Sequence, residues 1–178
     1  QQNRDGLLGR DAGVDGLKAG HTDAAGYCLV SSAKRGNMRL IAVVLDSDSV
    51  KGREGASAAL LNYGYTFYET VSVEKAGTTV LRPRVYKAAE EYYPIGPATD
   101  VDVVLPREQA GSIQTNAALD GVLIAPLTRT TPVGQLQIVV GGRTVRSVPL
   151  FPATDVPQGG LWSRMSDTVR LWLRRRHQ

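Results

Sequence analysis

The chain has little cysteine, no long apolar run and, outside its last twenty residues, no net charge. Cys28 is its single cysteine, which excludes an intrachain disulfide, and its apolar neighbours predict a small buried core residue. No run of 18 apolar residues occurs, so we expect no segment to span a membrane. The beginning of the sequence also lacks a charged-then-apolar leader, so no signal peptide is visible.

The basic excess is confined to the C-terminal end. Of 21 basic and 17 acidic residues, five arginines and one aspartate lie within residues 159–178, which leaves 16 of each sign for the rest. A body without net charge argues against a protein that binds nucleic acid, which presents a basic surface. We therefore expect no nucleic-acid partner.

The first third of the chain predicts an antiparallel sheet. Apolar runs at residues 13–18, 26–32 and 38–45 predict three adjacent strands, and residues 34–37 form a good hairpin turn. Residues 40–45 are continuously apolar, which suits a strand covered on both faces.

A helix over about residues 50–66 is predicted next, packed on this sheet. The polar run at residues 46–49 offers helix caps. The apolar residues that recur at helical spacing are Ala56, Ala59, Leu60, Tyr63 and Phe67.

After Thr70 the pattern changes to short alternating runs separated by Gly, Pro, Asn and Asp, which predicts a small all-β sandwich. The runs are residues 71–73, 78–81, 84–86, 101–105, 113–115, 134–140 and 144–148. We therefore expect an α+β chain with three parts: residues 1–70, a β-sandwich at 71–158, and a C-terminal amphipathic helix within 159–178.

The tail carries one apolar stripe and one basic face on a helical wheel. The stripe comprises Leu161, Trp162, Met165, Val169, Trp172 and Leu173. Two tryptophans on the stripe and arginines opposite it indicate a helix that lies on a membrane surface. The alternative is a helix packed on the core of its own domain, with a solvated arginine face.

A lysine followed by a small residue and a glycine ends the first apolar strand. Gly20 allows a ligand or another backbone to come close to this strand. A partly desolvated Lys18 can activate a nucleophile or bind an anion, and His21 and Thr22 add polar groups at the same rim. From these residues alone, a strand ending in a solvated lysine and a glycine turn remains an alternative.

Several runs in this order resemble one enzyme family over essentially the whole chain: the low-molecular-weight penicillin-binding proteins of the D-alanyl-D-alanine carboxypeptidase type. The runs are Val14–Thr22 (VDGLKAGHT), Ala25–Tyr27, Arg39–Val44, Lys51–Glu54 and Trp162–Asp167. The first part would then be a remnant of the transpeptidase-like domain of this family.

The resemblance implies acyl transfer from the D-Ala-D-Ala end of peptidoglycan stem peptides to a serine, followed by hydrolysis. It assigns proton movement and anion binding to Lys18, and half of the oxyanion hole to the backbone N–H of His21. Substrate binding would fall to Lys18, Ala19, Gly20, His21, Thr22 and Arg53. Arg53 would approach the substrate carboxylate, although a merely solvated Arg53 is equally compatible with its position.

The resemblance further implies partners and a location. Peptidoglycan stem peptides and, for the full-length protein, β-lactams would bind at this site, and the tail helix would contact the inner-membrane surface. The protein would lie at the periplasmic face of the inner membrane of a Gram-negative bacterium. We expect neither a cofactor nor a metal ion.

Two departures from the family pattern limit this interpretation. Ala19 stands where the family has a hydroxyl residue, which would weaken binding of a substrate carboxylate. The two Ser-x-x-Lys strings, Ser31–Lys34 and Ser72–Lys75, fall in a predicted hairpin and a predicted strand, where serine and lysine cannot cooperate. We therefore expect a chain that lacks the part bearing the nucleophile; the alternative is a non-catalytic periplasmic, membrane-associated spacer or protein-binding module.

Overall fold

The computed structural model describes residues 5–175, except for the side chains of residues 163, 169, 171 and 173–175. The chain divides into two compact units. The first comprises residues 1–70 with 104–110, and the second comprises residues 71–103 with 111–178.

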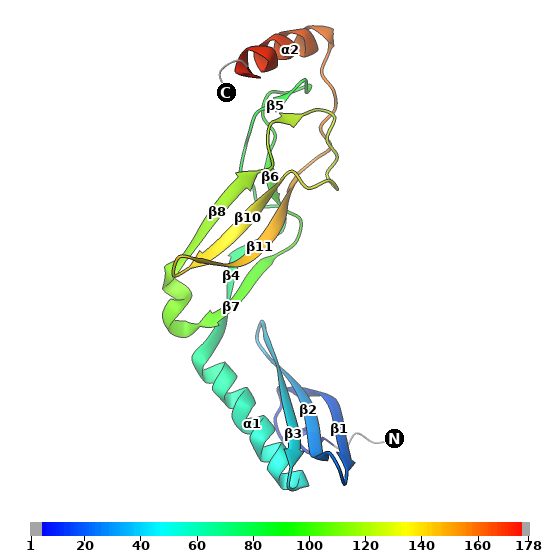
Figure 1. The fold of residues 1–178 in the computed structure, drawn as a ribbon, viewed down its shortest axis with the longest axis vertical. Helices are drawn as coiled ribbons and strands as arrows, with labels where there is room; N and C mark the ends of the chain where they lie inside the picture. The colour runs from blue at the N-terminus through cyan, green and yellow to red at the C-terminus, as the bar shows by residue number, and fades with distance from the viewer. Residues whose placement is uncertain (1–4, 176–178) are drawn as a thin grey trace. The chain divides into compact units, whose positions relative to one another are not determined.

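A three-stranded antiparallel sheet forms the first unit, as predicted. Its strands are β1 (Val14–Thr22), β2 (Gly26–Arg35) and β3 (Met38–Ser47), in the order β1-β2-β3 (Figure 1). The β2–β3 hairpin closes at Gly36, whose φ of +60° favours glycine. β1 extends beyond the predicted strand, through the residues that carry the candidate chemistry.

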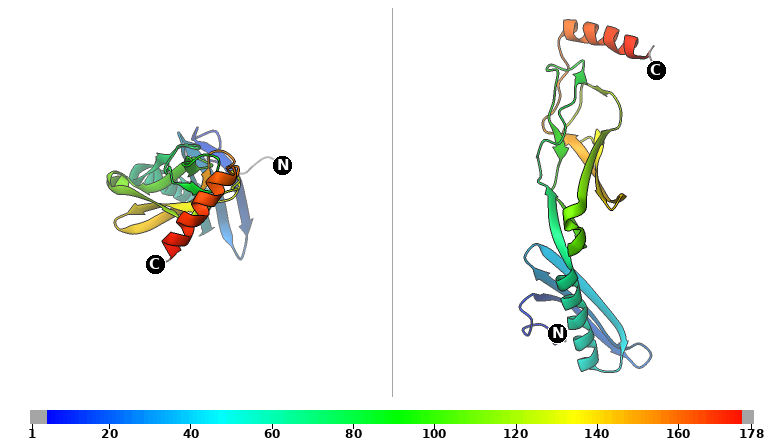
Figure 2. Two further views of the ribbon diagram at one scale, coloured as in Figure 1. Left: turned by 90° about the horizontal axis from the view of Figure 1, so that it is seen from above. Right: turned by 90° about the vertical axis from the view of Figure 1, so that its left-hand side faces the viewer.

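Helix α1 (Val50–Phe67) lies along one face of this sheet, as Figure 2 shows. The Ser49 hydroxyl caps the helix by accepting a hydrogen bond from the Gly52 N–H at 3.0 Å. Near the other end, the Tyr65 hydroxyl donates to the Ala33 carbonyl at 2.7 Å and ties the helix to β2. The predicted helix is therefore confirmed.

The face of α1 that packs on the sheet is not the predicted one. The buried residues of the helix are Arg53, Glu54, Ser57 and Leu61. The predicted apolar stripe is exposed instead: it comprises Ala56, Ala59, Leu60, Tyr63 and Phe67. The prediction failed because three of the four packed residues are polar, and hydropathy does not assign polar residues to a buried face. Arg53 bonds to backbone carbonyls of β1 and β2, and Glu54 pairs with Arg10 at 3.2 Å.

The two faces of the sheet differ. The inner face and α1 enclose a small core of Leu7, Val14, Ala19, Leu29, Ala33, Ala42 and Leu61. On β3, Ile41, Val43 and Leu45 are 61%, 55% and 69% exposed. The prediction of a strand covered on both faces is therefore wrong for the described residues, because only the inner side chains meet a packing partner.

The remaining strands of the chain are short. A four-stranded antiparallel sheet in the second unit has the order β6-β11-β10-β8, and the other strands form two pairs, β4-β7 and β5-β9. The bounds are β4 (Tyr68–Glu74), β5 (Val85–Tyr86), β6 (Ile95–Pro97), β7 (Val101–Pro106), β8 (Ile113–Leu119), β9 (Leu123–Ile124), β10 (Gly134–Val140) and β11 (Arg143–Pro152); a 3₁₀ turn, η1 (Arg107–Ser112), follows β7.

Most predicted strands of this unit are present, with two kinds of difference. Residues 78–81 form no strand, and only Leu81 makes an isolated bridge, to Ile95. β6 and β9 were not predicted, because strands of three and two residues are too short to show an alternation of apolar and polar residues. Ile95, Leu136 and Leu150 are almost wholly buried in the core of the unit. The sandwich arrangement of its sheets stays a prediction.

Helix α2 (Leu161–Arg175) belongs to the second unit and is held there by an acidic side chain. Asp167 is only 5% exposed. Its carboxylate accepts hydrogen bonds from Arg84 Nη2 at 3.1 Å and from the Lys87 N–H at 2.6 Å. Lys87 adopts a left-handed backbone (φ 58°), which carries a conformational cost for a non-glycine residue. The helix α2 therefore contacts the second unit through its polar side.

An ion pair also links the three strands of the first unit. Arg39 on β3 donates to both carboxylate oxygens of Asp15 on β1, at 2.8 and 2.7 Å, and to the Ser32 hydroxyl on β2. The Arg39 guanidinium, and after it the Ser32 hydroxyl, lower the pKa of the Asp15 carboxyl to about 2. The bidentate geometry favours the ionised carboxylate.

We predict that Asp15→Asn destabilises the chain at neutral pH and has progressively less effect in acid. The pKa of Asp15 in the folded chain lies below the value of about 3.9 of an unfolded aspartate. The stabilisation is therefore present above pH 4 and is lost as the pH falls towards 2. Urea unfolding at pH 7 and pH 2 measures the free energy of unfolding of the variant and of the unchanged chain. Asp23→Asn, in the β1–β2 turn, is the control. The prediction would be contradicted if Asp15→Asn lowered the free energy of unfolding by the same amount at both pH values.

Candidate active-site edge

Strand β1 forms one edge of the described sheet, because β2 pairs with it on one side only. Lys18, Gly20, His21 and Thr22 are all exposed along this edge. An edge strand offers unpaired N–H and C=O groups to which an extended peptide can add as a further strand. The candidate substrate-binding residues therefore share one accessible strand.

The lysine and the glycine of this edge differ in what surrounds them. Lys18 Nζ donates to the carbonyl of Ala19 at 2.7 Å, so the ammonium group lies back along its own strand. A Cβ placed on Gly20 would meet no atom within 4 Å. The backbone at Gly20 is thus open to close approach, as the sequence predicted.

At the end of β1, the side chains of His21 and Thr22 are engaged locally. The imidazole of His21 lies 4.0 Å from the ring of Tyr27, its register partner on β2, with a tilt of 32°. Thr22 Oγ1 accepts a hydrogen bond from the Ala25 N–H at 3.1 Å and closes the β1–β2 turn. Sequence reasoning did not identify Tyr27, although the register of a short hairpin would have placed it beside His21.

Arg53 lies beneath this edge. Its Nη1 donates to the Gly20 carbonyl at 3.0 Å and to the Cys28 carbonyl at 3.2 Å, and Gly20 and Cys28 are register partners. The guanidinium carbon is 5.8 Å from the centre of the Tyr27 ring. With a side chain buried in this way, the interpretation of a solvated Arg53 is wrong. The expected approach of Arg53 to a substrate carboxylate stays a prediction.

Ala19 points into the protein. It is 5% exposed and belongs to the small core under the sheet, with Leu29 and Leu61. The residue that departs from the family pattern therefore has a packing role in this chain. Weaker binding of a substrate carboxylate, expected from its missing hydroxyl, stays a prediction.

Neither Ser-x-x-Lys string forms a nucleophile site. Ser31–Lys34 lies within β2, where Ser31 is fully buried and donates to Asp5 at 3.4 Å. Ser72 lies within β4, and Lys75 follows that strand. Neither serine begins a helix, so neither string has the geometry that the family's serine and lysine require, and the first lies within β2 rather than in the predicted hairpin turn. Within the described residues, no group of three or more His, Cys, Asp or Glu side chains could hold a metal ion.

The apolar side chains of α2 that the structure describes are exposed. Leu161, Trp162, Met165 and Trp172 are 75%, 86%, 65% and 52% exposed. The other two residues of the predicted stripe, Val169 and Leu173, have side chains outside the described part of the chain. No helix among the described residues is long and apolar enough to cross a membrane.

We predict that Arg53→Ala lowers the free energy of unfolding by about 2–4 kcal/mol, because the Gly20 and Cys28 carbonyls lose a charged donor and the helix loses a buried side chain. Lys51→Ala is the matched control. Lys51 is an exposed cation on the same helix, so its loss should cost less than about 1 kcal/mol. Chemical denaturation measures both variants, and amide exchange at His21 and Tyr27 tests the local effect. Equal stability of the two variants would refute the role given to Arg53.

Comparison with known families matches both units. Residues 68–158 match the family described as penicillin-binding protein 5, C-terminal domain. Residues 1–49 match the family described as D-alanyl-D-alanine carboxypeptidase.

Individual relatives agree with the family matches. The Escherichia coli (strain K12) D-alanyl-D-alanine carboxypeptidases DacA and DacD are 36% and 38% identical to the chain, over 96% and 94% of its length. The matches cover 43% and 44% of those proteins, so the chain spans less than half the length of these curated relatives.

Solved structures give the same result. Penicillin binding protein 5 from Haemophilus influenzae superposes with a TM-score of 0.79 at 35% identity, over 89% of this chain and 47% of that one. The carboxypeptidase DacD from Francisella tularensis gives 0.61 at 35% identity, over 89% of this chain and 40% of that one. The chain therefore belongs to the low-molecular-weight penicillin-binding proteins of the D-alanyl-D-alanine carboxypeptidase type.

Proposed function

We propose that this chain supplies the substrate-binding edge of a serine-type D-Ala-D-Ala carboxypeptidase that trims the stem peptides of peptidoglycan. The observation that carries the proposal is the sequence Lys18-Ala19-Gly20 on an exposed edge strand. An extended stem peptide would add to this edge through backbone hydrogen bonds.

In this proposal a serine attacks the carbonyl of the D-Ala-D-Ala bond, D-alanine leaves, and water hydrolyses the acyl-enzyme. Lys18 would assist proton movement and attract the negative charge of the peptide. The N–H of His21 would stabilise the oxyanion, and the stacking of its ring on Tyr27 supports a fixed backbone there. Arg53 would act as a positioning residue, because it ties the Gly20 carbonyl to the carbonyl of the neighbouring strand.

The serine itself would come from sequence ahead of residue 1. Both serine strings within the chain lie in or beside strands, and the relatives are more than twice as long as the region they share with it. By itself the chain would be inactive. β-Lactams would acylate the longer protein, as expected for this family.

The membrane surface is the second part of the proposal. α2 is held to the second unit through Asp167, while Trp162, Met165 and Trp172 remain exposed. Packing of the apolar stripe on the unit's own core would have buried these side chains. An interfacial helix beside arginines fits the periplasmic face of the inner membrane.

We predict that incubation with a penicillin adds the mass of the drug to a chain extended upstream, but not to this 178-residue chain. Intact-mass spectrometry measures the adduct on both. Lys18→Ala in the extended chain should lower the rate of labelling by at least about a hundredfold. Lys34→Ala is its control, since that lysine belongs to a coincidental string. Labelling of the short chain would place a nucleophile within residues 1–178, and no labelling of either would favour the non-catalytic spacer or binding module.

We predict that the chain binds vesicles containing anionic lipid, and that Trp162→Ser with Met165→Ser lowers the partition coefficient at least about tenfold. These substitutions remove exposed apolar area, which contributes roughly 25 cal/mol per Å² when buried. Cosedimentation with vesicles measures binding. Tyr92→Ser serves as the control, because that ring is 52% exposed elsewhere in the second unit. Equal binding of the double variant and the control would contradict the interfacial role.

A further inference from the structure

Helix α2 is held in place by polar contacts rather than by an apolar core. It has 15 residues, and among its described side chains Asp167 alone is buried. The described core of the second unit lies between Val80 and Val156, so it includes no residue of α2. An isolated helix of this length is only marginally stable in water, since helices in proteins are stabilised mainly by packing of an apolar face. The order of α2 therefore depends on its polar contacts.

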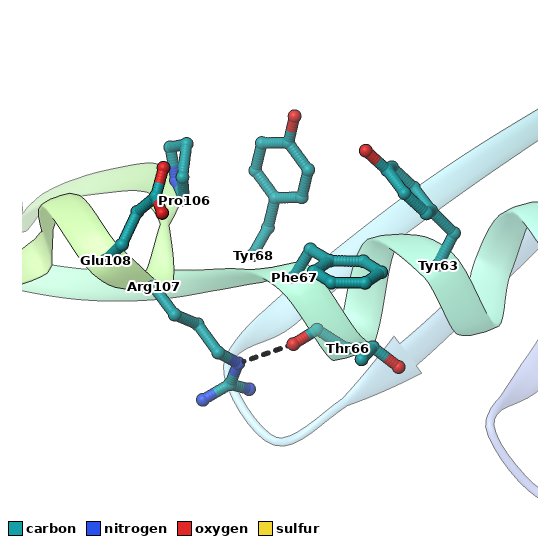
Figure 3. Close-up of a pocket in the computed structure, with 7 residues that line it drawn as sticks. All are labelled: Tyr63, Thr66, Phe67, Tyr68, Pro106, Arg107 and Glu108. Carbon is teal, nitrogen blue, oxygen red and sulfur yellow. Dashed lines mark hydrogen bonds between the residues drawn. The ribbon is translucent and has the colours of Figure 1, made fainter.

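The other helix of the chain, α1, is stabilised at several places. Ser49 caps its beginning, and Leu61 packs in the core under the sheet. At its end, Arg107 Nε donates to the Thr66 carbonyl at 3.0 Å, as Figure 3 shows. Loss of one of these contacts would leave the others. The described part of α2 has one buried side chain in their place.

Lys87 holds the C-terminal segment at two points. Its N–H donates to the Asp167 carboxylate at 2.6 Å, and its carbonyl accepts a hydrogen bond from the Gly159 N–H at 2.8 Å. Gly159 precedes α2 and Asp167 lies about two turns into it, so the two contacts fix where the helix begins and which side faces the unit. The left-handed φ of 58° at Lys87 is a strained conformation, which persists where surrounding contacts determine it.

The second donor to Asp167 is oriented by its own neighbours. Arg84 Nη2 lies 3.1 Å from Asp167 Oδ1, while Arg84 Nη1 pairs with Glu91. The Arg84 guanidinium carbon also lies 5.1 Å from the centre of the Tyr86 ring. Within α2, Arg170 Nη1 is 3.7 Å from the same carboxylate oxygen. A cation and a backbone N–H of the second unit are thus placed to receive a carboxylate at this position of the helix.

We propose that Asp167 is a positioning residue that orders α2 before any partner reaches it, with Arg84 and Lys87 as the receptor for its carboxylate. The consequence for lipid rests on the membrane contact proposed above. A helix that is already formed loses less conformational entropy when it binds a surface, so its affinity for the surface is higher. Without Asp167, α2 would have to order on the lipid itself.

The first test is amide hydrogen exchange in water without lipid, on Asp167→Asn. Asparagine keeps the size of the side chain and one acceptor oxygen but removes the charge. We expect exchange at residues 165–172 to become at least about tenfold faster, and exchange at Leu136 and Ile138 in the core to be unchanged, which shows that the unit is folded. Asp120→Asn is the matched control, because Asp120 is an exposed aspartate of the second unit.

Arg84→Met tests the receptor. It should also speed exchange in α2, and its combination with Asp167→Asn should be no faster than the more affected single variant, because both substitutions remove one contact. Additive effects of the two substitutions would show that Arg84 acts elsewhere and would overturn its part in the receptor.

The second test is cosedimentation with vesicles of phosphatidylcholine and anionic phosphatidylglycerol. Asp167→Asn should lower the partition coefficient at least about tenfold, whereas Asp120→Asn, which removes the same charge, should not. Trp162→Ser with Met165→Ser should show the converse pattern: it loses affinity for lipid but keeps the slow exchange of α2 in water. Ordering of the helix and contact with lipid are thereby measured separately.

Two results would overturn the inference. Equal exchange rates of α2 in Asp167→Asn and Asp120→Asn would refute the positioning role. Faster exchange in Asp167→Asn with unchanged or higher affinity for vesicles would refute the consequence for lipid. If the unchanged chain binds no vesicles, the proposed membrane contact fails, and amide exchange still decides whether Asp167 orders α2.

Discussion

The buried guanidinium of Arg53 is the interaction on which the geometry of the candidate edge depends. It joins the carbonyls of Gly20 and Cys28, two residues that face each other across β1 and β2. The group belongs to α1, so one side chain links the helix to both strands. Burial of a charge is costly unless it is hydrogen-bonded, and here the backbone carbonyls of β1 and β2 accept hydrogen bonds from its Nη1. The position of Gly20 and the packing of the helix are therefore fixed together.

Much of the first unit was predictable because its signals are local. The β2–β3 hairpin has a glycine at the turn, the strands are apolar runs, and Ser49 precedes a helix. The packed face of α1 was not predictable in this way. Hydropathy selected Leu60, Tyr63 and Phe67, whereas Arg53 and Ser57 occupy the face that meets the sheet. The partners of Arg53 are carbonyls of β1 and β2, which are distant in sequence, so no local pattern indicates its burial.

Partners distant in sequence also explain why Asp167 is buried. On a helical wheel it belongs with the arginines of a solvated face, yet it is the described residue of α2 that the second unit buries. Arg84 and the backbone of Lys87, about eighty residues earlier in the chain, provide the partners. The roles of Lys18, Gly20 and His21 came from family resemblance. The structure adds that they share one exposed strand and that Ala19 faces the core.

α1 also acts as a fixed spacer between two surfaces of the first unit. Its early residues are packed under β1, and its last residues present Tyr63 and Phe67. Each residue of an α-helix turns the chain by about 100°, so one residue inserted between these ends would rotate Tyr63 and Phe67 by about 100° relative to the sheet of β1, β2 and β3. The number of residues in α1 is thus more tightly constrained than the identity of its exposed residues. Over evolution, substitutions in the middle of this helix should accumulate, while insertions and deletions should not.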